Sequence, residues 1–96
     1  MRDERQKLAG LAEILNRCRE LCAASDDAMF SSTTVSEIAS VLDRAIDAIA
    51  AGVEPDRSQL KLLFAPTGAI QEISMANGWH SEYIELSTRF DDLIAG

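Results

Sequence analysis

Apolar residues recur every three or four positions near the start of the chain, and this spacing most constrains the fold. The intervals are 3, 4, 3 and 4 residues in the series Leu8, Leu11, Leu15, Cys18 and Cys22. Side chains spaced in this way lie on one face of an α-helix. The pattern predicts a helix over residues 3–24, and Ile14 and Leu21 widen its apolar face enough to contact two neighbours.

The same period predicts four more helices, at residues 34–51, 57–64, 68–76 and 82–94. Capping and terminating signals mark their ends, namely Thr34 with Glu37, Asp56 with Gln59, Ser81, Gly52 and Gly78. Apolar and polar residues do not alternate as they would in a strand. We therefore expect an all-α bundle of about five helices with antiparallel neighbours, and residues 1–96 as a single domain.

Acidic residues outnumber basic ones by 16 to 9, which leaves a net charge of −7. The surplus lies after residue 20, where twelve acidic and four basic side chains give a balance of −8. Phosphate groups repel such a chain, so we expect neither nucleic-acid nor membrane binding. The simplest interpretation of the acidity is solubility. If the acidity serves binding, the protein partner is expected to be basic.

The expected compartment is the cytoplasm. The first residues lack the apolar run of a signal peptide, and no window approaches 18 uncharged apolar residues. Cys18 and Cys22 are the only cysteines, and their spacing of one helical turn gives poor disulfide geometry. We expect both to be small, buried apolar residues.

Residues capable of catalysis are few and form no recognisable motif. The two cysteines lack the further ligands that a zinc ion or an iron–sulfur cluster requires. His80 is the only histidine, and an enzyme would need it in one pocket with Tyr83 and a carboxylate such as Glu82. We therefore expect a protein that is not an enzyme, with no cofactor and no metal site.

The most distinctive stretch of the chain is residues 63–79. It contains Leu63-Phe64, then Thr67-Gly68, and soon afterwards the amide and acidic pair Gln71-Glu72. This stretch resembles small bacterial helical domains of unknown function that are associated with toxin-immunity settings. The resemblance implies a helical fold, and it transfers no functional residue.

The leading hypothesis is a non-enzymatic, acidic protein-binding module of the inhibitor, immunity or anti-defence type. Carboxylates on helix faces would dock on a larger basic partner and could mimic the charge of a nucleic acid. An aromatic and polar patch before the last helix would add contacts. The candidate partner-binding residues are Asp43, Asp47, Trp79, His80, Glu82, Tyr83 and Glu85.

The alternative hypothesis is a self-associating structural protein without a small-molecule ligand. This hypothesis starts from the apolar face of the helix at residues 3–24, which it takes to be wider than one small core covers. In that case Leu8, Leu11, Leu15 and Leu21 would pack across the two-fold axis of a homodimer.

Overall fold

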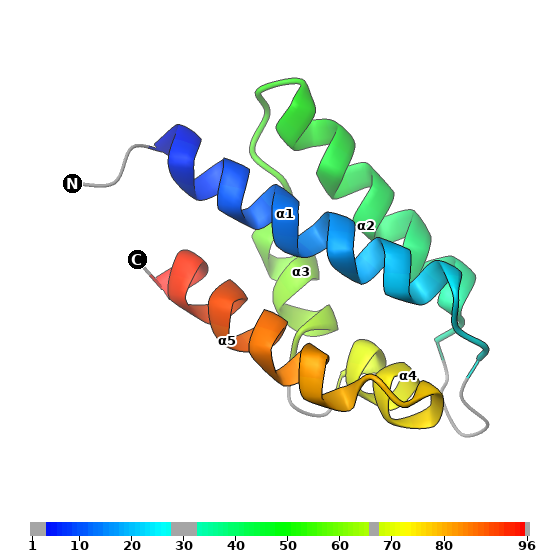
Figure 1. Cartoon of the computed structure of the whole chain (residues 1–96). Helices are drawn as coiled ribbons and strands as arrows, with labels where there is room; N and C mark the ends of the chain where they lie inside the picture. Colours follow the sequence, from blue (N-terminus) through cyan, green and yellow to red (C-terminus); the bar gives the residue numbers. More distant parts are fainter. Residues whose placement is uncertain (1–3, 28–32, 66–67, 96) are drawn as a thin grey trace.

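A computed structural model of the chain describes residues 4–27, 33–65 and 68–95. The described part is all-α, as predicted, and is drawn in Figure 1. Its helices are α1 (Glu4–Ala23), α2 (Val35–Ala50), α3 (Arg57–Leu63), α4 (Ala69–Asn77) and α5 (His80–Ala95). Each boundary lies within two residues of the predicted one. None of these helices is both long and apolar enough to cross a membrane.

Helix α1 occupies the centre of the bundle. It packs against α2 on one side and α5 on the other, and both neighbours run antiparallel to it (Figure 1). The short helices α3 and α4 contact each other and α2, and α4 also packs on α5. The start of α1 and the end of α5 therefore lie at the same end of the bundle.

Every helix contributes buried side chains to one core. The members from α1 are Leu11, Ile14, Leu15, Cys18 and Cys22, and those from α2 are Ile38, Leu42 and Ala45. The other half of the chain adds Leu60, Leu63, Phe64, Ile70, Ile73, Tyr83, Leu86 and Phe90. Phe64 and Phe90 stack with ring centroids 4.4 Å apart, so two of the few aromatic rings join α5 to the end of α3.

The two cysteines are buried within this core and are not bonded to each other. Burial raises the pKa of the Cys18 thiol to about 12 and that of Cys22 to about 11. Since the thiolate is the reactive form, both side chains act as small apolar residues, which confirms the prediction.

Local chemistry explains most helix ends. Thr34 and Glu37 form the predicted capping box at the start of α2, and Asp56 accepts from the Gln59 amide at the start of α3. Gly78 takes a left-handed conformation, with φ of 81°, directly after α4. The prediction that Ser81 caps the last helix is wrong. Helix α5 begins at His80, and the Tyr83 amide already donates to the Trp79 carbonyl at 3.0 Å.

Phe90→Ala should lower the free energy of unfolding by about 3–5 kcal/mol, because it removes a buried ring together with the stacking contact between Phe90 and Phe64. Chemical denaturation measures the change. Leu62→Ala is the matched control, since Leu62 is 74% exposed and its truncation should cost less than about 0.5 kcal/mol. Equal losses in the two variants would contradict this description of the core.

Candidate protein-docking surface

The structure divides the seven candidate residues between two sides of α1. Asp43 and Asp47 lie on α2, whereas the other candidates lie at the start of α5 or just before it. Helix α1 separates these two groups (Figure 1). The sequence therefore grouped residues that the fold does not bring together in one contiguous site.

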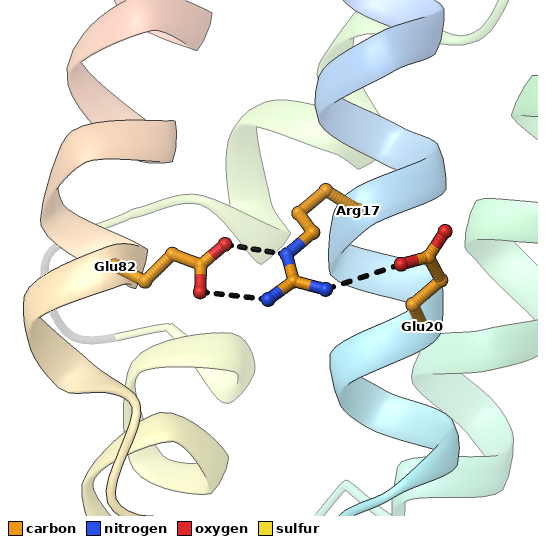
Figure 2. Close-up of polar contacts among 3 residues, drawn as sticks. All are labelled: Arg17, Glu20 and Glu82. Atoms are coloured by element: carbon orange, nitrogen blue, oxygen red, sulfur yellow. Dashed lines mark hydrogen bonds and ion pairs between the residues drawn. The ribbon is translucent and has the colours of Figure 1, made fainter.

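Glu82 is held by an arginine of α1. Arg17 donates from Nε and Nη2 to Oε2 and Oε1 of Glu82, at 2.5 and 3.0 Å, and from Nη1 to Glu20 at 3.1 Å (Figure 2). Such a paired, two-point contact is the strong form of an arginine–carboxylate interaction. Hydrogen bonding from Arg17 lowers the pKa of Glu82, and hydrogen bonding to Glu82 and then Glu20 raises the pKa of Arg17.

Asp43 is neutralised in the same way on the other side of α1. Arg19 Nε donates to Asp43 Oδ1 at 2.8 Å and so ties α1 to α2. A weaker pair at 3.5 Å joins Glu13 of α1 to Arg89 of α5. The carboxylates of Asp43 and Glu82 are therefore already compensated, which makes them poor attractors for a basic partner.

Trp79 fastens the segment after α1 to the turn between α4 and α5. Its Nε1 donates to Ser25 Oγ at 2.9 Å, and Ser25 Oγ donates to the Leu21 carbonyl at 2.7 Å. Beside it, the Asn77 side chain exchanges two hydrogen bonds with the backbone of Asp26, at 2.9 and 2.8 Å. Trp79 is partly buried against the core and has a structural role.

A shallow groove of about 240 Å³ lies between α4 and α5. Its lining residues are Gln71, His80, Tyr83, Ile84, Ser87 and Thr88. Tyr83 is only 3% exposed, donates to the Ala65 carbonyl at 3.3 Å and forms part of the floor, so it is not the exposed anchor that the sequence suggested. Burial raises the pKa of its hydroxyl. His80 lies beside it, with ring centroids 6.2 Å apart.

A second groove of about 460 Å³ lies between α3 and α5. Its lining residues are Lys61, Phe64, Ala65, Ser87, Phe90, Asp91 and Ile94. Ser87 lines both grooves, which therefore adjoin each other along α5. We call the two grooves together the α5 groove.

Exposed apolar side chains accompany the α5 groove. Met75 of α4 is 59% exposed and Ile84 of α5 is 51% exposed. Gln71 Nε2 approaches the Met75 sulfur at 3.8 Å, which places Met75 beside the groove. Large exposed apolar side chains next to a groove are typical of protein-binding surfaces.

Four carboxylates without an ion pair lie on the same two helices. Within the described ranges nine carboxylates take part in no ion pair, namely Asp26, Asp27, Glu37, Asp47, Asp56, Glu72, Glu85, Asp91 and Asp92. All nine are exposed, and Glu72, Glu85, Asp91 and Asp92 belong to α4 and α5. The only arginine or lysine of these two helices is Arg89, which pairs with Glu13. Helices α4 and α5 therefore carry a surplus of acidic side chains, whereas the lining of the α5 groove itself contains one acidic residue, Asp91, and one basic residue, Lys61.

Residues of the α5 groove were largely missed by the sequence analysis. Ile84 and Met75 are not among the seven candidate residues predicted from the sequence, although both are exposed beside the groove. An apolar residue on the polar side of an amphipathic helix was the available signal. The groove itself depends on three helices, so no local pattern shows it.

Comparison of the chain with protein-family models, with curated proteins and with solved structures finds no match. The resemblance of residues 63–79 to toxin-immunity domains therefore stays a prediction, and its Thr67 lies outside the described residues. In the described part of the chain, no three His, Cys, Asp or Glu side chains are grouped to hold a metal ion.

Glu82→Gln should lower the free energy of unfolding at neutral pH, and this difference from the unchanged protein should disappear in acid. The folded pKa of Glu82 is below its ordinary value of 4.5, so its stabilising contribution is present above that pH and disappears as the pH falls through the folded pKa. Thermal unfolding of both proteins between pH 7 and pH 3 measures the difference. Glu85→Gln, on the same helix but without an ion pair, should show no comparable pH dependence.

Trp79→Phe should cost about 1 kcal/mol of stability by removing the hydrogen bond to Ser25. Ser25→Ala removes the same bond from the other side. The double variant should therefore cost less than the sum of the two single changes, which urea denaturation can measure. Additive losses would mean that the Trp79–Ser25 bond contributes nothing.

Proposed function

We propose that this protein is a non-enzymatic, acidic protein-binding module of the inhibitor, immunity or anti-defence type. It docks on a larger, basic protein partner. The observation that carries the proposal is the coincidence of uncompensated carboxylates with exposed apolar side chains on α4 and α5. Glu72, Glu85, Asp91 and Asp92 supply the charge, and Met75 and Ile84 supply apolar contact area.

This combination suits fast and selective association. Carboxylates without internal partners retain their field in solution, and this field steers a basic surface toward them. Apolar side chains then contribute affinity by leaving water. The carboxylates that α1 neutralises, Asp43 and Glu82, would contribute little to this field. A surface of this charge also suits a partner site that otherwise receives phosphate groups.

Self-association through α1 has less support from the residues involved. Leu11 and Leu15 are buried within the chain's own core, with 4% and no exposure. Leu8 and Leu21 are partly buried. A homodimer through α1 would therefore lack two of its four expected contacts.

The test is a capture experiment with the tagged protein and lysate of its native host, at low and at high salt. We expect one stoichiometric partner with a basic surface, released as the salt rises because screening weakens long-range attraction. Recovery of only the protein itself, as a defined dimer, would overturn the proposal and favour the structural alternative.

Charge reversal on the captured pair tests which surface docks. The double variant Glu85→Lys and Asp91→Lys should slow association by about tenfold or more at low salt. Asp47→Lys on α2 is the control, since Asp47 is equally exposed and unpaired but lies beyond α1. Stopped-flow or surface-based kinetics measure the rates. Equal slowing per reversed charge at both places would contradict docking through α4 and α5.

A further inference from the structure

Helix α5 carries two stripes with helical spacing. The first is the core stripe of Tyr83, Leu86, Phe90 and Leu93, at intervals of 3, 4 and 3 residues. The second consists of residues that line the α5 groove, at intervals of 4, 3, 4 and 3, namely His80, Ile84, Ser87, Asp91 and Ile94. A stripe with this spacing packs naturally against another α-helix.

The shape of the α5 groove fits one helix. His80 and Ile94 are 14 positions apart, which corresponds to about 21 Å along the helix axis. Ser87 and Ala65 are among the lining residues, and such small side chains allow the backbone of a second helix to approach closely. Phe64 and Phe90 add apolar lining.

The charge around the groove selects the kind of helix that can bind. Asp91 lies in the groove, and Glu72 and Glu85 are adjacent in sequence to Gln71 and Ile84 of its lining. Asp92 lies on the other side of α5, in a pocket with Gln6 and Gly10 of α1. Lys61 is the only lysine or arginine among the lining residues. A second copy of the same surface would bring like charges together, which disfavours a homodimer here.

Gln71 adds a polar feature to the groove. Its Oε1 is buried and has no hydrogen-bond partner among the described residues, although Gln71 lines the groove between α4 and α5. A buried acceptor without a donor is unfavourable. A lysine or arginine side chain entering the groove could supply that donor after a small rotation of the amide.

We propose that the α5 groove binds a basic, amphipathic α-helix of about four turns, presented by the protein partner. Its apolar side would cover Ile84, Met75 and the floor at Phe64 and Phe90. Its lysines or arginines would face Glu72, Glu85 and Asp91. This is the helix-in-groove mode of recognition. The inference rests on the proposed function for the existence of such a partner, and it specifies the partner's binding element.

A synthetic peptide tests the groove directly with the full chain. The probe is a 14-residue helix with leucines along one side and lysines elsewhere. One control has the same composition in an order that destroys the apolar side, and another has glutamates in place of the lysines. Titration followed by backbone amide chemical shifts should move the signals of His80, Ile84, Ser87, Asp91 and Ile94. The control peptides should bind at least about tenfold more weakly.

Matched variants show whether the groove residues are responsible. Ile84→Ser should weaken peptide binding by about tenfold, whereas Val53→Ser should not, because Val53 is similarly exposed (57%) but precedes α3 and lies outside the groove lining. Circular dichroism checks that both variants keep their helices. Asp91→Lys and Asp47→Lys form a second pair in which only the first should weaken binding.

The outcomes separate the inference from the proposed function. Three results would overturn the groove inference. The first is chemical-shift changes centred on Asp47 or spread over all carboxylates. The others are equal binding of the control peptide whose order destroys the apolar side, and no binding at about 1 mM peptide. A basic partner captured from lysate would then still support acidic docking elsewhere. Peptide binding at the groove without any captured partner would uphold the groove and overturn the proposed function.

Discussion

The burial of α1 on two sides at once sets the arrangement of the whole molecule. Ile14, Leu15 and Cys18 have no exposed surface, although α1 alone would leave them in water. Burying an aliphatic side chain of this size contributes roughly 1.5–3 kcal/mol, so a packing that left either side of α1 open is strongly disfavoured. Helices α2 and α5 meet this requirement from opposite sides, and α3 and α4 close the remaining face of the core.

The same central position explains where the charge of the protein remains. Helix α1 holds its arginines at the edges of its two interfaces, where Arg17 and Arg19 meet Glu82 and Asp43. These exposed pairs add little stability. Their larger consequence is electrostatic, because they remove charge from the surfaces beside α1. Glu72, Glu85, Asp91 and Asp92 of α4 and α5 take part in no ion pair, and of these four Asp92 lies beside α1, in a pocket with Gln6 and Gly10.

Helix α5 consequently serves two purposes with two sets of residues. Its core stripe packs against α1, and Phe90 of this stripe stacks on Phe64. Both contacts hold α5 in place. Its second stripe does not pack in the core and instead lines the α5 groove, beside α3 and α4. A rigid helix that presents charge and apolar area in fixed register is better prepared for binding than a flexible loop would be, because less conformational entropy is lost.

Most of the fold could be predicted from the sequence, whereas most of the candidate site could not. Apolar spacing and capping residues such as Thr34 and Asp56 are signals that involve residues only three or four positions apart. Each helix can therefore be predicted from its own stretch of sequence. The start of α5 was misplaced by two residues because Ser81 looked like a cap. Trp79 was expected at a binding patch, but its partner Ser25 lies 54 positions away and no local pattern connects them.

The sequence by itself determined the helices, the buried cysteines and the surplus of acidic residues after residue 20. These properties depend on composition and on short-range periodicity. Only the tertiary structure decided which carboxylates are neutralised and which remain, because the pairing of Arg17 with Glu82 joins residues 65 positions apart. It likewise decided that the second stripe of α5 lines a groove, since the walls of that groove come from helices brought together by packing in the core.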